Sequence, residues 1–288
     1  MSAQGLHPKT ISSLVLARIA VGALLALLVT SSVSAQVTIT HLGNEGFLLE
    51  GGGKKVLVDA LYDGLRGYVT PPPDLRNRLL AAEDGFADVD LVLATHHHDD
   101  HFSPDPVNYY LEANSKAEFL STPQAVARLG LDSADGLLQR VRGVLPEEGK
   151  IEERTLNGVR VQILNLHHGR NRNPQVQNLG FIIHLGGRRV LHIGDTMATV
   201  EDWAPLEMEA QPVDVALVPA WYMTFPAFIE VIREQLQPKH IAAMHVADKH
   251  APEAYFGRYE SQAKQIATLK RIFPSAQVFT KPGQSHRY

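Results

Sequence analysis

The stretch VDLVLATHHHDDHF, residues 89–102, joins a run of apolar residues to a dense cluster of histidine and aspartate. The nearly continuous apolar run 89–94 is typical of a strand buried on both faces. If the chain stays extended beyond it, His96 and His98 point the same way, because side chains alternate along a strand, and Asp100 and His101 follow a turn. Imidazole nitrogens suit zinc and similar metals, and a carboxylate beside a histidine offers an oxygen-richer site. The stretch therefore predicts a buried strand that ends in a metal-binding loop, with an exposed, solvated loop as the alternative.

The segments around this stretch predict a mixed α/β fold. Short apolar runs separated by glycine turns predict a β-meander, and Asn-Gly and Gly-Gly pairs between apolar runs predict two hairpins. An amphipathic pattern near the C-terminal end predicts a long helix. The meander covers 37–42, 47–50 and 55–61, the hairpins cover 152–166 and 181–195, and the helix covers 252–273.

The chain contains an internal similarity. LGNEGFLLEGGGKKVLVDAL, residues 42–61, resembles NLGFIIHLGGRRVLHIGDTM, residues 178–197, and VDLVLATHHHDDHF is followed in the same relative place by VDVALVPAWYMTF. The alignment pairs Asp59 with Asp195. Repeats of this kind bury faces that neither half could bury alone. We therefore expect two related halves, with two packed sheets and helices outside, in a single domain over residues 36–288.

Three further segments place histidine or aspartate at the end of an apolar strand. They are NLHHGR at 165–170, HIGDTM at 192–197 and AAMHVAD at 242–248. Loops at strand ends are where α/β proteins usually carry their functional residues. These segments strengthen the prediction of a metal site.

With these motifs in place, the chain resembles the metallo-β-lactamase superfamily. Its H-x-H-x-D-H signature is matched by His96, His98, Asp100 and His101, and later motifs follow in the family's order as His168-Gly169, Gly194-Asp195-Thr196 and His245. The resemblance implies a four-layer αββα sandwich. The opening ITHLGNEGFLLE is most similar to the branch that contains the ascorbate-6-phosphate lactonase, although Asn44 stands where that branch often has histidine.

The resemblance implies a binuclear metal site with two divalent ions, zinc or alternatively manganese. The first ion would take His96, His98 and His168, the second Asp100, His101 and His245, and Asp195 would bridge them. Strand alternation does not decide between His167 and His168, and the resemblance favours His168 because the family's ligand stands next to this glycine. Asp59 is interpreted as a support for the ligand loops.

The resemblance predicts a hydrolase in which a hydroxide held by two metals attacks an ester, lactone or phosphodiester-type bond of a small molecule. Asp100 would be the catalytic residue that orients the hydroxide. The chain has no cysteine and no Gly-x-Ser-x-Gly motif, which disfavours a protein nucleophile. Two alternatives stay open: a mononuclear iron enzyme like the sulfur dioxygenases of the superfamily, and a metal-binding module without catalysis.

Four residues are candidates for contact with the substrate. Arg170 and Arg172 follow the histidine-glycine motif and could hold a carboxylate or phosphate, with solvated loop charge as the alternative. Trp221 and Tyr222 follow a predicted strand and could form an aromatic wall, with packing as the alternative.

Residues 1–35 have the pattern of a secretory signal peptide. Lys9 and Arg18 precede the apolar run IAVGALLALLV at 19–29, and Val33 and Ala35 resemble a small-residue cleavage site. An uncleaved anchor is the alternative, but the run is shorter than the roughly 20 residues of a spanning helix. Cleavage predicts a periplasmic or secreted protein without a stable membrane anchor.

The charge of the mature chain argues against polyanionic partners. Removing Lys9 and Arg18 leaves 25 basic residues against 31 acidic ones. This modestly acidic balance offers no broad surface for nucleic acid. A small-molecule substrate is therefore expected, and the oligomeric state stays open.

Overall fold

The computed structural model describes Met1 and residues 35–64, 67–132, 134–171, 173–250 and 261–288, and Ala35–Tyr288 form one compact unit. The predicted signal segment lies almost entirely outside the described residues. Of the helix expected over 252–273, α6 (Gln262–Ile272) is described, whereas 252–260 are not. No helix in the described ranges is long and apolar enough to cross a membrane.

Two seven-stranded mixed sheets form the centre of this unit. In spatial order, the first sheet contains β14 (Ser285–Arg287), β1 (Thr38–Gly43), β2 (Gly46–Gly51), β3 (Lys54–Val58), β4 (Leu91–Leu93), β5 (Glu118–Ser121) and β6 (Val141–Gly143). The second contains β13 (Gln277–Val278), β12 (His240–Met244), β11 (Val215–Pro219), β10 (Arg188–His192), β9 (Leu179–Leu185), β8 (Val159–Asn165) and β7 (Ile151–Leu156). The predicted meander and both hairpins are confirmed.

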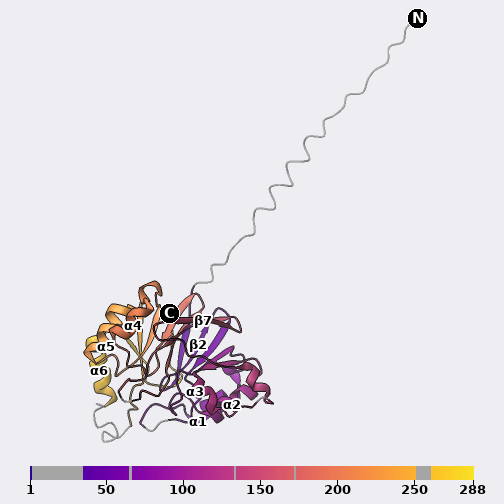
Figure 1. Cartoon of the computed structure of the whole chain (residues 1–288), viewed down its shortest axis with the longest axis horizontal. Helices are drawn as coiled ribbons and strands as arrows, with labels where there is room; N and C mark the ends of the chain where they lie inside the picture. Colours follow the sequence, from indigo (N-terminus) through magenta and orange to yellow (C-terminus); the bar gives the residue numbers. More distant parts are fainter. Residues whose placement is uncertain (2–34, 65–66, 133, 172, 251–260) are drawn as a thin grey trace. The chain divides into compact units, whose positions relative to one another are not determined.

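Helices cover the outer face of each sheet (Figure 1). The first sheet carries α1 (Pro73–Leu80), α2 (Pro104–Ala113) and α3 (Pro123–Arg128), with 3-10 turns η1 (Asp84–Phe86) and η2 (Gly136–Arg140). The second carries α4 (Val200–Trp203), α5 (Pro226–Glu230) and α6, with 3-10 turns η3 (Ala204–Leu206) and η4 (Met208–Ala210) and a π-helical segment η5 (Val231–Leu236). The predicted four-layer αββα sandwich is confirmed.

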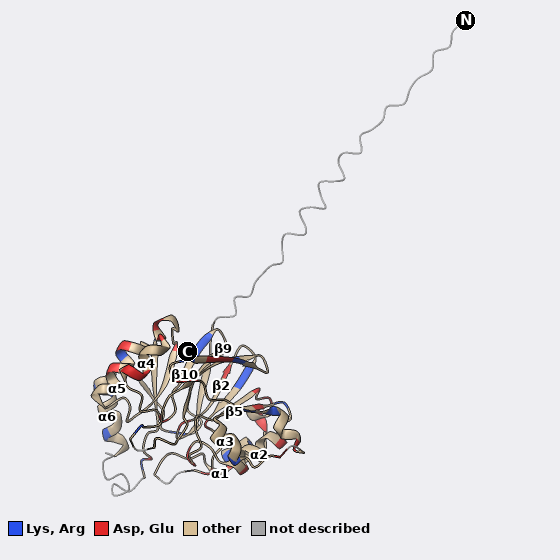
Figure 2. Ribbon diagram, viewed as in Figure 1, with Lys and Arg blue, Asp and Glu red and all other residues tan. Residues whose placement is uncertain are grey.

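Strand alternation explains why both sheets are buried on both faces. In β4, Leu91 and Leu93 pack between the sheets, whereas Val92 packs under the helices of the first half. In β11, Val215 packs between the sheets and Val218 under the helices of the second half. Successive side chains of a strand point to opposite faces, so a continuous apolar run supplies two core layers at once. Figure 2 shows acidic and basic residues interspersed over the elements that surround these layers.

The two halves repeat the same strand pairing. In the first half, β2–β3 is antiparallel, and β3–β4 and β4–β5 are parallel. In the second half, β9–β10 is antiparallel, and β10–β11 and β11–β12 are parallel. This confirms the two related halves. The equivalent strands β3 and β10 are followed by Asp59 and Asp195, so the repeat delivers a carboxylate from each sheet to the same kind of position.

The hairpin turn of the second half has less space than its equivalent in the first half. Gly186 has φ +57°, and a Cβ there would lie 2.0 Å from the backbone oxygen of Gln36. Gly53 has φ +74°, with no atom within 4 Å of such a Cβ.

We expect Gly53→Ala to cost about 1 to 2 kcal/mol, because alanine disfavours the left-handed region. Gly186→Ala should cost clearly more, since it adds a clash with Gln36 to the same backbone penalty. Urea unfolding of the two variants beside the parent protein measures the difference. Equal losses of stability would show that the close approach at Gly186 carries no energetic weight.

Candidate metal centre

Three histidines from two different strands meet at one edge of the sandwich. His96 and His98 follow β4, and His168 follows β8. Their ring centroids are 4.7 Å apart in each of the three pairs, and His96 Nε2 lies 3.1 Å from His98 Nδ1. One ligand nitrogen from each ring lies within 4.8 Å of the others, so the three can hold one metal ion. We call these residues the three-histidine position.

A second group lies beside it and mixes carboxylates with histidines. Asp100 Oδ2 lies 3.5 Å from both His101 Nε2 and His245 Nε2, and Asp195 lies 3.6 Å from each of these nitrogens. Two donors bound tetrahedrally to one zinc-sized ion at about 2.1 Å are about 3.4 Å apart. The observed separations are long for hydrogen bonds but suit donors that share an ion. We call this group the mixed position.

Asp195 connects the two positions. Its Oδ2 is 3.6 Å from His101 Nε2 and 3.7 Å from His168 Nε2, and its Oδ1 is 3.6 Å from His245 Nε2. One carboxylate is therefore within reach of donors from both groups. This is the placement expected of a ligand that bridges two ions.

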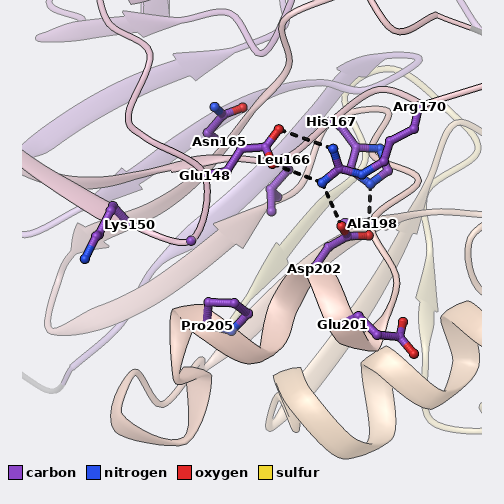
Figure 3. Close-up of a pocket in the computed structure, with 11 residues that line it drawn as sticks. Glu148, Lys150, Asn165, Leu166, His167, Arg170, Ala198, Glu201, Asp202 and Pro205 are labelled. Atoms are coloured by element: carbon purple, nitrogen blue, oxygen red, sulfur yellow. Dashed lines mark hydrogen bonds and ion pairs between the residues drawn. The ribbon is translucent and has the colours of Figure 1, made fainter.

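His168, and not the neighbouring His167, contributes to the three-histidine position. His167 Nε2 instead lies 2.9 Å from Asp202 Oδ2. Asp202 also accepts a hydrogen bond from Arg170 at 2.9 Å, and Arg170 pairs with Glu148 at 3.1 Å. Figure 3 shows these side chains gathered at a pocket of about 450 Å³. The two imidazoles therefore diverge: His168 faces His96 and His98, whereas His167 faces Asp202.

Two of the candidate substrate-contact residues, Arg170 and Tyr222, are paired with other groups of the protein. Arg170 is paired with two of the protein's own carboxylates, so its binding capacity is used internally. Tyr222 has 0% exposure and donates its hydroxyl hydrogen to the Ala198 carbonyl oxygen, so it is a packing residue and its predicted substrate contact is wrong. Trp221 is half-buried and packs edge-on against Tyr222. Arg172 lies outside the described residues.

Asp59, which the resemblance led us to interpret as a support for the ligand loops, forms hydrogen bonds with the loop that follows β4. Its carboxylate is fully buried and accepts hydrogen bonds from the Thr95 backbone N–H and hydroxyl, both at 2.7 Å. The same carboxylate lies 2.9 Å from His101 Nδ1. A histidine whose Nδ1–H is held by a carboxylate presents its Nε2 to a metal. Asp59 thus sets both the orientation of His101 and the path of the chain into the loop.

Asn44 has a visible function at the place where the resembling branch often has histidine. Its amide donates to the backbone oxygen of Asp100 at 3.2 Å and to Asp100 Oδ2 at 3.3 Å. The side chain therefore holds the mixed position's aspartate instead of adding a nitrogen ligand. The sequence comparison within the chain did not reveal this role.

The electrostatics differ between the two positions. Burial lowers the pKa of His96, His98 and His168, which keeps them in the neutral form that binds metals. At the mixed position, burial opposes protonation of His101 and His245. Asp100 next to His101 and Asp195 next to His245 nevertheless raise their pKa values well above the ordinary value. The field of the carboxylates thus favours a positive charge there.

Several buried polar atoms of the cluster have no hydrogen-bond partner among the described residues. They include His101 Nε2, His168 Nε2 and Asp195 Oδ1. Buried polar atoms are normally paired, and an ion is one of the accepted reasons for an exception. The donor types and their separations both fit divalent metal ions.

Glu45 also lies in this region, and sequence reasoning missed it. Its side chain is fully buried, and burial raises its pKa well above the ordinary value. It lies within 4.8 Å of potential ligand atoms on His101, Asp195 and His245. The only available sequence signal was an acidic residue inside a glycine-rich turn between two apolar strands.

The chain matches a family model and resembles two archaeal relatives. Residues 38–245 match the family model of the β-lactamase superfamily domain. A UPF0173 protein of Pyrococcus furiosus is 30% identical over 234 residues, which cover 80% of this chain and 93% of that protein. A UPF0173 metal-dependent hydrolase of Pyrococcus abyssi is 29% identical over 213 residues, 73% of this chain and 84% of that protein.

A solved structure with the same fold is that of a metallo hydrolase from the hyperthermophilic archaeon Ignicoccus hospitalis. It superposes with a TM-score of 0.59 at 18% identity, over 88% of this chain and 98% of its own. At this identity the likeness concerns the fold alone.

The divergence of His167 and His168 can be tested with two adjacent substitutions. We expect His168→Ala to lose the ion of the three-histidine position, because it removes one of that position's three nitrogens. His167→Ala should retain the metal content of the parent protein, since this imidazole pairs with Asp202. Elemental analysis of both purified proteins decides the matter. Loss of metal in the His167 variant alone would reverse the assignment.

Proposed function

Because the chain belongs to the β-lactamase superfamily, as a metal-dependent hydrolase of the metallo-β-lactamase fold, we propose that it cleaves an ester, lactone or phosphodiester-type bond of a small molecule at a binuclear metal centre. One observation carries the proposal. Donor atoms for two adjacent ions converge at the same edge of the sandwich, and Asp195 lies within 3.7 Å of donors in both groups. A single structural ion would not require the second group.

The residues divide into two sets of ligands. His96, His98 and His168 would hold the first ion, and Asp100, His101 and His245 would hold the second, with Asp195 shared. When bound, two zinc or manganese ions supply a hydroxide nucleophile at neutral pH and stabilise the oxyanion that develops at the attacked centre.

The protein's own contribution is orientation. Asp100 faces His101 and His245, and burial of its carboxyl is outweighed by these two histidines, which lower its pKa well below the ordinary value. It therefore stays ionised and can accept a hydrogen bond from the nucleophile, which it would orient toward the substrate. Asn44 restrains the same carboxylate at 3.3 Å. Catalysis by this arrangement needs no nucleophilic side chain, in keeping with a chain that lacks cysteine.

The two alternatives are less well supported. An iron oxygenase with a single ion would need only part of this donor set, whereas ligands for both positions are present, and a curated relative is named as a hydrolase. A metal-binding module without catalysis would use the same ligands, including Asp100, so the name of the curated relative, a metal-dependent hydrolase, is what favours catalysis.

The proposal predicts that Asp100→Asn abolishes a metal-dependent hydrolysis. We expect a loss of about 10²-fold or more in kcat/KM. The reason is that a neutral amide cannot bind the metal ion as an anion and is a weaker acceptor for the hydrogen bond from the nucleophile. Metal-stripped protein should be inactive and should regain activity with zinc or manganese. The measurement is a hydrolysis screen with lactone, phosphodiester, thioester and β-lactam substrates.

The neighbouring Asp99→Asn is the matched control. Asp99 pairs with Arg128 at 3.0 Å, and its side chain is 71% exposed, so its substitution should leave turnover unchanged. A wild-type protein that binds metal but hydrolyses none of these substrates would favour the non-catalytic module. One iron per chain with consumption of oxygen would favour the oxygenase.

We also propose that the mature chain acts in the periplasm or outside the cell, on a small-molecule substrate. The support is the N-terminal pattern, with its apolar run at 19–29 and small residues before position 36.

Expression of the whole chain in a secreting bacterial host should yield an exported protein that begins at Gln36. Intact mass measurement of the purified protein identifies the first residue. Ala35→Arg should block this cleavage, because the processing site requires a small side chain. Recovery of the wild-type protein with its first 35 residues intact would contradict cleavage.

A further inference from the structure

Glu45 lies in the tight turn between β1 and β2. The turn packs against the end of β3: a Cβ on Gly46 would lie 2.8 Å from the backbone oxygen of Asp59. The side chain of Glu45 has no exposure to solvent. Its backbone oxygen, by contrast, is satisfied by His192 Nε2 at 3.0 Å. The backbone of the turn is thus anchored, and the carboxyl group is enclosed.

The carboxyl group of Glu45 has no hydrogen-bond partner within the described part of the chain, at either oxygen. Its Oε2 atom lies 3.7 Å from His101 Nδ1. That nitrogen is already 2.9 Å from Asp59 Oδ2, which is the better acceptor by distance. A buried carboxyl without a partner is costly, so its presence calls for an explanation.

Candidate metal ligands around the carboxyl group of Glu45 supply an explanation for its burial. An oxygen of Glu45 and ligand atoms of His101, Asp195 and His245 all lie within 4.8 Å of one another. Two of these residues are candidate donors of the mixed position through their Nε2 atoms, and Asp195 is shared with the three-histidine position. A cation among these groups would meet the carboxyl group that the protein itself leaves unpaired.

We propose that Glu45 is a further acidic group of the mixed position, and that it gives this position a preference for a harder cation, such as manganese, over zinc. The inference rests on the binuclear centre of the proposed function and goes beyond its ligand set. With Glu45, the mixed position would have three carboxylates, from Glu45, Asp100 and Asp195, beside the imidazoles of His101 and His245. The neighbouring position has three imidazoles and shares only Asp195. Carboxylate-rich sites suit manganese, whereas imidazole-rich sites suit zinc.

The charges support the same conclusion. Asp59, Asp100 and Asp195 place three carboxylates around the two positions, and Glu45 adds a fourth. Each added carboxylate offsets part of the positive charge that two divalent ions bring into a low-dielectric interior, and the hydroxide of the proposed mechanism supplies a further negative charge.

Glu45→Gln tests this role, with Glu50→Gln as the control. The amide keeps the size of the side chain and removes its charge. Glu50 lies on β2, is 36% exposed and pairs with Lys55 at 3.5 Å, so its loss should not affect metal binding. Both variants and the wild type are stripped with a chelator and titrated with manganese or zinc alone, and stoichiometry and affinity are measured by calorimetry.

In the wild type we expect two equivalents of manganese. In Glu45→Gln the second equivalent should bind at least tenfold more weakly, with a smaller change for zinc and an unchanged first equivalent. Thermal unfolding gives an independent readout. Without metal, Glu45→Gln should be as stable as the wild type or more so, because it lacks an unpaired buried carboxyl. The rise in Tm on adding manganese should be smaller.

Three results would overturn the inference. The first is an unchanged affinity for the second manganese ion. The second is a loss of stability in the metal-free variant, including failure to fold, which would make Glu45 a structural residue. In both cases a wild type that binds two ions leaves the proposed function intact. The third is a wild type that binds fewer than two ions, which would overturn the binuclear function together with the role of Glu45.

Discussion

The hydrogen-bonded carboxylate of Asp59 is the interaction on which the metal centre depends. Asp59 follows β3 and has a backbone φ of +45°. Its carboxylate accepts two hydrogen bonds from Thr95 and lies 2.9 Å from His101 Nδ1. A non-glycine residue in the left-handed region is strained, and such strain persists only where the surrounding contacts compensate for it. Here the hydrogen bonds between Asp59 and Thr95 connect the ends of β3 and β4. The buried sheet therefore sets the conformation of the loop that carries the histidine cluster.

Strand direction makes the convergence of the donors possible. Within the first sheet, β3 and β4 are parallel, and within the second, β10, β11 and β12 are parallel, while β8 runs the same way because β9 is antiparallel to both of its neighbours. Residues that follow such strands emerge at one edge of their sheet. The repeat therefore brings six candidate donors and Asp195 together, although they span residues 96–245 of the sequence.

This edge of the sandwich concentrates buried polar atoms that the protein does not pair with each other. His101 Nε2, His168 Nε2 and both carboxylate oxygens of Glu45 are among them. A fold tolerates such atoms when a ligand repays their desolvation, which couples metal binding to stability. The pocket lined by His167, Arg170 and Asp202 is different, because Arg170 and His167 are paired there with Asp202. Neighbouring residues thus serve a ligand site and a structural network.

The sequence by itself determined the strand pattern, the two related halves, the layered architecture and the order of the metal-binding motifs, because apolar periodicity and motif spacing are local properties of the chain. Only the tertiary structure decided that His168 and not His167 joins the cluster, that Asn44 restrains Asp100, that Tyr222 is a packing residue, and that Glu45 lies beside the mixed position. Each of these depends on distances between residues that are far apart in sequence or on which way adjacent side chains turn. Periodicity does not encode such distances; they arise when two sheets pack and their strand ends meet.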